Sequence, residues 1–191
     1  SYARDLETPV LLHVRTVKGK NYPPAEKNPD AFHGVSRFCI QTGEALQPSK
    51  PSFSGAFGAA MCALAEQESR LCAITAAMRD GTGLKEFSRC YPDRYFDVGM
   101  AEGQAVAMAA GMDKGGAVPV LAVYSCLLHR GYDMLLHDVG IQGLHVVFGV
   151  DRAGLVGEDG ETHHGLFDVA YLATVPGMTV LAPASFAELR S

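Results

Sequence analysis

The sequence predicts an α/β fold, a doubly wound and mostly parallel sheet with helices on both faces. Short apolar runs alternate with helical patterns along most of the chain. These runs have no polar face, which is typical of strands buried between two layers of helices. No glycine-rich phosphate motif of the GxGxxG or P-loop type follows a strand, which argues against a free-standing nucleotide-binding domain.

The bulk composition excludes several classes of protein. The 191-residue chain is 48% hydrophobic and 19% charged, so a packed core is expected. The formal net charge is -5 and no basic tract is present, which argues against a nucleic-acid surface. Five cysteines without a CxxC pair argue against zinc and a disulfide framework, and they fit a reducing cytoplasm. No apolar run approaches the ~18 residues of a membrane span.

Regular elements are expected mainly after residue 51, where strand and helix patterns alternate. The expected strands are 71–75, 94–98, 117–124, 144–150 and 178–182. The expected helices are 54–68, 84–89, 101–112, 127–142 and 167–173. A long loop rich in glycine and acidic residues, 151–165, follows the fourth expected strand.

The first 50 residues have a different pattern. Residues 9–17 are rich in Val and Leu and predict a strand. The prolines that follow Tyr22 argue against a helix there, because proline lacks the N–H that a helix interior needs. We therefore expect residues 1–21 to be the end of a diphosphate-binding domain and 22–50 to be an interdomain linker. Residues 51–191 are then a second domain that is incomplete at its C-terminus, so the chain is expected to be cut from a larger protein.

Polar and reactive side chains follow the expected strands. In a doubly wound sheet, ligands bind outside the carboxyl ends of the strands. The residues at these positions are Met78, Arg79, Asp80, Glu102, Ser125, Cys126, His129, Arg130, Asp151, Arg152, Glu158, Asp159, Thr162, His163 and His164. Their accumulation at one edge of the sheet predicts a functional site.

Glu102 and the two arginines each allow a purely structural interpretation. Glu102 lies in an expected first helical turn, where the helix dipole favours a negative charge without any chemistry. Arg130 and Arg152 are candidates for phosphate binding, since the guanidinium fork matches phosphate oxygens. Ordinary surface ion pairs with Asp133 and Asp159 are the alternative, and the sequence leaves both open.

Two further patterns carry weaker signals. His163 and His164 resemble a metal-binding pair, but adjacent residues rarely face the same ion. Ser125 and His129 have the spacing of a nucleophile and its base on a helix, but the GxSxG turn that exposes such a serine is missing.

Residues 91–102, Tyr-Pro-Asp-Arg-Tyr-Phe-Asp-Val-Gly-Met-Ala-Glu, resemble the pyrimidine-domain signature of thiamine-diphosphate enzymes. Within this transketolase-like group, these residues are most similar to those of the 1-deoxy-D-xylulose-5-phosphate synthase family. The other segments that carry the resemblance are 18–27, 32–35, 73–81, 124–133, 137–139 and 151–165. They cover nearly the whole chain in collinear order.

The resemblance implies a reaction, cofactors and partners. The family condenses pyruvate with D-glyceraldehyde 3-phosphate, releases CO2 and forms 1-deoxy-D-xylulose 5-phosphate for isoprenoid and thiamine synthesis. It uses thiamine diphosphate with Mg2+ and is expected to be a cytoplasmic homodimer. The Gly-Asp-Gly motif that holds the metal in this family is absent here. The resemblance therefore implies that the metal and diphosphate ligands lie in the missing diphosphate domain, and that this piece alone is inactive.

The resemblance also implies residue roles around the cofactor. Glu102 matches the glutamate that hydrogen-bonds the ring nitrogen of the aminopyrimidine. Tyr22, Met78 and Leu127 match cofactor-contacting positions, although the family commonly has an aromatic residue where Leu127 stands. A second departure is Gly103-Gln104, where the family usually has Gln-His.

Other matched residues belong to substrate binding and catalysis. Arg130, Arg152 and Tyr124 match positions that bind the triose phosphate or line its pocket. His33, His163 and Asp159 match positions near the reaction centre, where protons are transferred. No metal ligand is predicted in this chain.

Two competing functions remain. The chain could be a split transketolase-like subunit that works with a separate diphosphate subunit, although the expected strand at 9–17 argues against this. It could also be a non-catalytic cofactor-binding domain with a decayed site. The polar residues that follow the strands argue against that alternative.

Overall fold

The computed structural model describes residues 2–29, 31–46, 50–157 and 160–191. The chain forms two compact units, Ser1–Lys50 and Pro51–Ser191. Each unit is described by itself.

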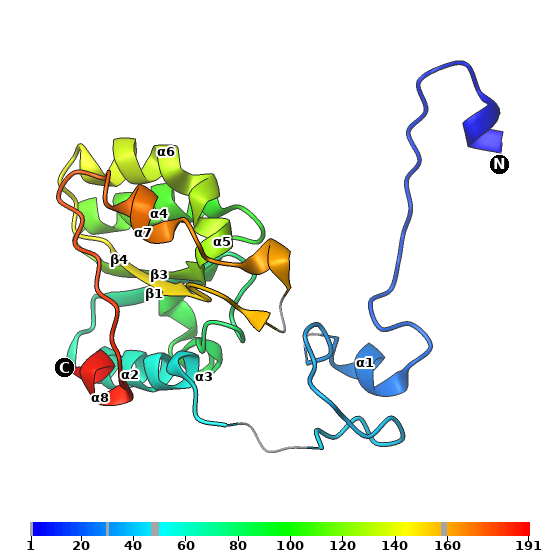
Figure 1. The fold of residues 1–191 in the computed structure, drawn as a ribbon, viewed down its shortest axis with the longest axis horizontal. Coiled ribbons are helices and arrows are strands. Elements are labelled where there is room, and N and C mark those ends of the chain that lie inside the picture. The colour runs from blue at the N-terminus through cyan, green and yellow to red at the C-terminus, as the bar shows by residue number, and fades with distance from the viewer. Residues whose placement is uncertain (1, 30, 47–49, 158–159) are drawn as a thin grey trace. The chain divides into compact units, whose positions relative to one another are not determined.

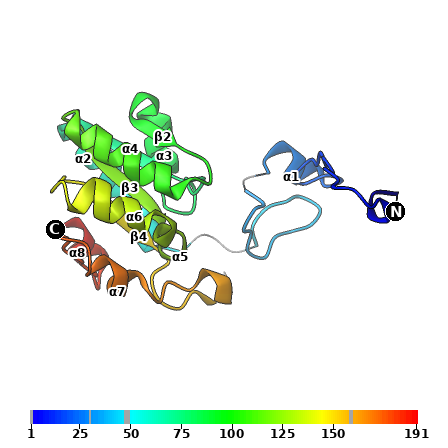
Figure 2. The ribbon, with the colours of Figure 1, turned by 90° about the horizontal axis from the view of Figure 1, so that it is seen from above.

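A four-stranded parallel sheet forms the centre of the second unit. Its strands are β1 (Leu71–Thr75), β2 (Tyr95–Asp97), β3 (Val118–Tyr124) and β4 (Val147–Asp151), in the order β2-β1-β3-β4. All five residues of β1 are buried, as the apolar run predicted. β2 and β4 mark the opposite edges of the sheet when it is seen from above (Figure 2). The predicted fold class is confirmed.

Helices cover both faces of this sheet (Figure 1). On one face, α4 (Glu102–Lys114) packs its Ala105, Val106 and Ala109 against the core. On the other face, α2 (Phe53–Gln67) and α3 (Lys85–Cys90) form a second core around Met61 and Phe87. Alternate side chains of β1 enter the two cores, as the period of two in a strand requires. The helices predicted over 54–68, 84–89 and 101–112 are confirmed to within three residues at each end.

The helix predicted over 127–142 is confirmed as a helical segment, but it is not one regular α-helix. The chain instead forms α5 (Ser125–Leu128), a 3-10 turn (His129–Gly131), α6 (Tyr132–Met134) and a π-helix (Leu135–Gly140). A Cβ atom at Gly131 would lie 2.9 Å from Cγ2 of Val106 in α4. The irregular segment thus approaches α4 at a glycine, a contact that the periodicity of the sequence does not reveal.

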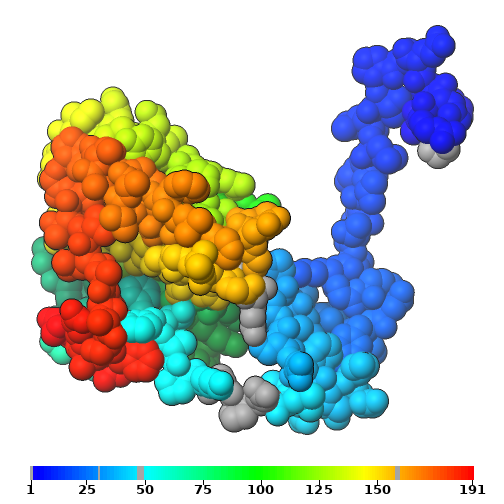
Figure 3. Space-filling view, viewed as in Figure 1, coloured from blue at the N-terminus to red at the C-terminus, as the bar shows by residue number. Residues whose placement is uncertain are grey.

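The fifth strand, predicted over 178–182, is wrong. After α7 (Asp168–Leu172), the chain runs as an extended, largely exposed segment to α8 (Phe186–Arg190). Figure 3 shows this segment on the surface as the red strip that ends in α8. Leu181 is 82% exposed, and no strand of the described sheet pairs with the segment. A strand needs a partner ladder, and β propensity alone does not supply one.

Two predictions for the first unit are corrected. Residues 9–17 form no strand, and Leu11 is 95% exposed. The prolines do not prevent a helix, because α1 (Pro23–Lys27) begins with them in its first turn. A proline is tolerated there, since the first N–H groups of a helix have no intrahelical partner. After a short 3-10 helix (Tyr2–Asp5), this unit is built around a cluster of three rings, Tyr22, Phe32 and Phe38.

No helix in the described ranges is long and apolar enough to cross a membrane.

Candidate functional site

Glu102 is the first residue of α4 and is one of the few buried charged groups of the second unit. Its side chain is only 4% exposed. Asp97 at the end of β2 prepares the turn before it, because Asp97 Oδ1 accepts hydrogen bonds from the N–H groups of Gly99 and Ala77. Gly99 has φ +69, a conformation that glycine adopts without strain. The strand, the glycine turn and the helix therefore deliver the carboxylate to the carboxyl edge of the sheet.

In the described part of the chain, the charged partner of Glu102 is Arg130. Arg130 Nη1 lies 3.7 Å from Glu102 Oε1, which is longer than a hydrogen bond. The Arg130 side chain is 58% exposed. Arg130 does not form the surface ion pair with Asp133 that the sequence left open as an alternative. Among the described residues, the Glu102 carboxylate therefore has this distant cation but no hydrogen-bond donor.

Met78, Tyr124 and Arg152 form a second group, drawn from the ends of three strands. The Tyr124 N–H donates to Met78 Sδ at 3.2 Å. The Arg152 guanidinium carbon lies 4.4 Å from the centre of the Tyr124 ring, which is a cation–π contact. Met78 is buried, whereas Tyr124 and Arg152 are partly exposed. The structure thus brings together three residues that the sequence assigned to cofactor and substrate binding.

Two residues among the contacts around Arg152, Gly81 and Ser54, were missed as parts of the site. Arg152 Nη1 donates to the Gly81 carbonyl at 2.6 Å and to Asp151 Oδ1 at 3.0 Å. Ser54 Oγ donates to the other oxygen of Asp151, Oδ2, at 2.6 Å. Asp151 was noted only as a strand-end acid, and no local signal links Ser54 to it from 97 residues away. The proposed Arg152–Asp159 pair is not tested, because Asp159 lies outside the described residues.

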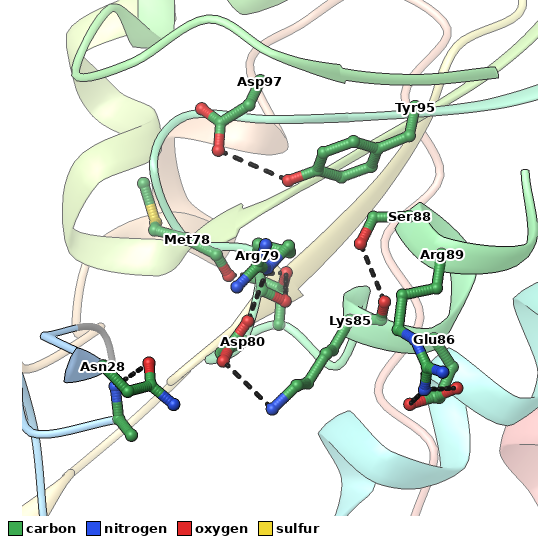
Figure 4. A network of polar contacts seen from close by, with 12 residues as sticks. Asn28, Met78, Arg79, Asp80, Lys85, Glu86, Ser88, Arg89, Tyr95 and Asp97 are labelled. Carbon is green, nitrogen blue, oxygen red and sulfur yellow. Dashed lines mark hydrogen bonds and ion pairs between the residues drawn. The ribbon is translucent and has the colours of Figure 1, made fainter. Parts of the chain in front are cut away.

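A second polar network supports the ends of β1 and β2 (Figure 4). The Tyr95 hydroxyl donates to Asp97 Oδ2 at 3.3 Å. Burial, together with the nearby Asp97 carboxylate, raises the pKa of Tyr95 well above its usual value. Asp80 pairs with Arg79 at 2.6 Å and with Lys85 at 3.7 Å. These contacts fix the loop after β1, which also carries Met78 and Gly81.

The loop predicted over 151–165 is closed at its base. Gly154 and Gly165 exchange two backbone hydrogen bonds of 2.9 Å each. Within the loop, the Val156 N–H donates to His164 Nδ1 at 3.1 Å, and His163 Nδ1 lies 3.0 Å from Thr162 Oγ1. His163 closes a 3-10 turn (Glu161–His163) and is partly exposed. Within the described ranges, no three metal-binding side chains gather to hold an ion.

Ser125 is not paired with His129. Its hydroxyl donates to Asp168 Oδ2 at 2.9 Å, and both residues are buried. His129 lines the same small pocket but is exposed. The nucleophile–base interpretation is therefore wrong, and Ser125 instead joins α5 to α7.

Tyr171 lines the same pocket, and burial raises the pKa of its hydroxyl.

The remaining predicted residues are Leu127, Tyr22 and His33. Leu127 is in α5 and packs against the main core. Tyr22 and His33 belong to the first unit. The Tyr22 hydroxyl donates to the Ile40 carbonyl at 2.9 Å, and His33 is exposed.

Comparisons with known proteins agree with this geometry. Residues 49–191 match the family model for the pyrimidine-binding domain of transketolase. The chain is 56% identical over 189 residues to a 1-deoxy-D-xylulose-5-phosphate synthase of Clostridium acetobutylicum, covering 99% of this chain and 30% of that protein. For the synthase of Aquifex aeolicus, the identity is 52% over 188 residues, with 98% and 30% covered. The chain thus spans about 30% of the length of the curated relatives it matches.

Solved structures give the same fold. A split-gene transketolase, described as an inactive β4 tetramer, matches with a TM-score of 0.62 and 25% identity over 71% of this chain and 44% of that one. The transketolase of Leishmania mexicana matches with a TM-score of 0.59 and 20% identity, over 69% of this chain and 21% of that one. With a family model that matches most of its length, the chain belongs to the transketolase pyrimidine-binding domain family.

Proposed function

We propose that this chain is the pyrimidine-binding part of a 1-deoxy-D-xylulose-5-phosphate synthase. The reaction would be the thiamine-diphosphate-dependent condensation of pyruvate with D-glyceraldehyde 3-phosphate, with release of CO2. The observation that carries the proposal is the buried Glu102 carboxylate at the carboxyl edge of the sheet, 4% exposed and 3.7 Å from Arg130. The relatives named as this synthase, at 52–56% identity, support the choice of reaction.

The described residues fit the pyrimidine end of thiamine diphosphate. Glu102, which is buried at the carboxyl edge of the sheet, would hydrogen-bond the ring nitrogen and share a proton with it. Met78 and Leu127 would supply apolar contact to the ring. When bound, the cofactor would supply the carbon nucleophile and the electron sink that this decarboxylation needs.

The second group of residues would bind the acceptor. Arg152, with its guanidinium against Tyr124, would hold the phosphate of glyceraldehyde 3-phosphate, and Arg130 would add a second positive charge. His163 and Asp159 would move protons at the acceptor carbonyl and hydroxyl. Tyr22 and His33 keep the cofactor and catalytic roles that the resemblance implies.

The domain assignment is part of the proposal. Residues 1–21 would end a diphosphate-binding domain, 22–50 would link the domains, and 51–191 would be the pyrimidine domain. The diphosphate and Mg2+ ligands would come from the rest of the protein. The whole protein would be a cytoplasmic homodimer, and this piece alone would not turn over substrate.

The proposal is tested with the full-length protein that contains this chain. We expect CO2 release from pyruvate in the presence of glyceraldehyde 3-phosphate, and Glu102→Ala should lower kcat about 10²- to 10⁴-fold. The kcat of the Glu102→Gln protein should fall by a similar factor, because the amide keeps the shape of the side chain but cannot share a proton as a carboxyl group does.

Glu86→Gln is the matched control for these variants. Glu86 is 61% exposed and pairs with Arg89 on α3, away from the two groups. Its rate should stay within about twofold of the wild-type value, as for most exposed ion pairs. A Glu102→Ala protein with the wild-type rate would contradict the proposal.

The match to a split-gene transketolase supports a second candidate, a subunit of a two-chain transketolase. The same assay separates the two candidates. A transketolase would consume a ketose phosphate donor without releasing CO2, whereas the synthase requires pyruvate and releases one CO2 per product.

A further inference from the structure

Arg152 has an unusual backbone conformation for a residue with a long side chain. Its φ is +58, in the left-handed region that non-glycine residues rarely adopt. Such a conformation is energetically unfavourable, and it persists only where surrounding contacts compensate for it. The contacts of Arg152 therefore indicate what its position is built to hold.

Asp151 makes two of these contacts. Its Oδ1 accepts from the backbone N–H of Arg152 at 2.8 Å and from Arg152 Nη1 at 3.0 Å. The Asp151 and Arg152 side chains are 22% and 26% exposed, so water screens this pair less than it screens a pair on the open surface. One carboxylate thus fixes both the strained backbone and the guanidinium of the next residue.

Ser54 fixes that carboxylate in turn. Its hydroxyl donates to Asp151 Oδ2 at 2.6 Å from the first turn of α2. Ser52, and not Ser54, caps this helix, because Ser52 Oγ accepts from the Gly55 N–H at 3.1 Å. The Ser54 hydroxyl therefore serves Asp151 and is not needed to begin the helix.

The face of the guanidinium and the same nitrogen, Nη1, make two further contacts. The guanidinium stacks 4.4 Å from the Tyr124 ring centre and donates to the Gly81 carbonyl at 2.6 Å. A hollow opens beside these contacts, lined by Ser52, Ser54, Asp80, Gly81, Asp151, Arg152 and Val156. Arg152 is its one cationic side chain among the described residues.

We propose that Ser54 and Asp151 are positioning residues, which hold the Arg152 guanidinium against Tyr124 so that it can bind the phosphate of the acceptor substrate. The inference rests on the proposed function for the identity of that substrate. The arrangement of Ser54, Asp151 and Arg152 is independent of it. Holding the fork in one geometry lowers the side-chain entropy lost when a phosphate binds.

The first test is steady-state kinetics of the full-length protein with Ser54→Ala. We expect the KM for glyceraldehyde 3-phosphate to rise about tenfold, with kcat and the KM for pyruvate changed less than about twofold. Ser54→Thr keeps the hydroxyl and should restore most of the KM. Ser88→Ala is the control, since Ser88 Oγ donates to the Lys85 carbonyl within α3 and touches no site residue.

The second test repeats Ser54→Ala in an Arg152→Ala background. If Ser54 acts through Arg152, the double variant should have the same KM for glyceraldehyde 3-phosphate as Arg152→Ala alone. If the two substitutions instead multiplied their increases in the KM for glyceraldehyde 3-phosphate, the proposal would be overturned. An unchanged KM in the Ser54→Ala protein would also overturn it.

A crystal structure of the Ser54→Ala protein separates failure of this inference from failure of the proposed function. The guanidinium should leave the Tyr124 ring, whatever reaction the enzyme catalyses. A guanidinium that stays stacked as in the wild-type protein would overturn the positioning role. If the wild-type protein has no synthase activity but the guanidinium moves, only the proposed substrate is wrong.

Discussion

Arg130 and Arg152 follow neighbouring strands of one sheet, yet the chain holds them in different ways. Arg152 is the residue directly after β4, and its side chain contacts Gly81, Asp151 and Tyr124. Arg130 lies six residues beyond the end of β3, in a 3-10 turn of an irregular segment, and its side chain is 58% exposed. Its charged partner in the described structure, Glu102, is 3.7 Å away.

The difference shows how distance from a strand affects the order of a side chain. A residue next to a parallel strand inherits the position that the ladder hydrogen bonds fix, here the pair Tyr124 and Asp151 in β3 and β4. A residue farther along must be held by its own contacts, and an exposed arginine gains little from a single distant ion pair. We therefore expect the Arg152 group to be rigid and sensitive to substitution, and the Arg130 group to be tolerant.

The largest expected effect comes from Gly81→Ala. A Cβ atom there would overlap the Tyr124 hydroxyl, so the ring that supports Arg152 must move. We expect the free energy of unfolding to fall by about 1–3 kcal/mol in a urea titration. Gly111→Ala in α4 is the control, because a Cβ at that position meets no atom within 4 Å. The free energy of unfolding of this control should rise by about 0.5–1 kcal/mol. If the two variants changed the free energy of unfolding equally, the Arg152 group would not be rigid.

A smaller effect is expected when each of the two arginines is replaced by lysine, and it should differ between them. Lysine has no planar group that could stack on Tyr124 while one of its nitrogens donates to Gly81 and Asp151. Arg152→Lys should therefore raise the KM for glyceraldehyde 3-phosphate about tenfold, whereas Arg130→Lys should change it less than about threefold. Steady-state kinetics on both variants is the measurement. The reverse order would show that the exposed arginine is the more important phosphate ligand.

The smallest effect is expected for Gly103→Ala, next to Glu102. The added Cβ would lie 3.1 Å from Cε and 3.4 Å from Sδ of Met134, which form the end of a flexible side chain. The methionine can move, and alanine favours the helix, so stability should change by less than about 1 kcal/mol. Thermal unfolding of the Gly103→Ala and Gly81→Ala proteins compares their stabilities. If Gly103→Ala lost as much stability as Gly81→Ala, the expected difference between the two positions would be wrong.

Strands and helices with strong patterns were predictable from the sequence. β1 is apolar at four of its five positions and is buried at all five, because a central parallel strand faces helices on both sides. Residues 9–17 and 178–182 have similar β propensity and form no strand. Whether such a run becomes a strand depends on a partner, and the run itself does not encode one.

The site divides in the same way. Glu102 and Arg152 could be identified because each follows a strand at the carboxyl edge of the sheet. The link between Ser54 and Asp151 could not, since it joins residues 97 positions apart. Ser125 had a plausible partner at His129 in the sequence, but its partner in space is Asp168.

By itself, the sequence determined the α/β class, the places of four strands along the chain and the edge where the charged residues gather. These follow from hydrophobic periodicity and from the direction of parallel strands, which are local properties of the chain. Only the tertiary structure decided that Arg152 is fixed through Ser54 and Asp151, while Arg130 faces Glu102 across a longer distance. Those contacts depend on how α2, β3 and β4 pack, and packing joins residues that no local pattern connects.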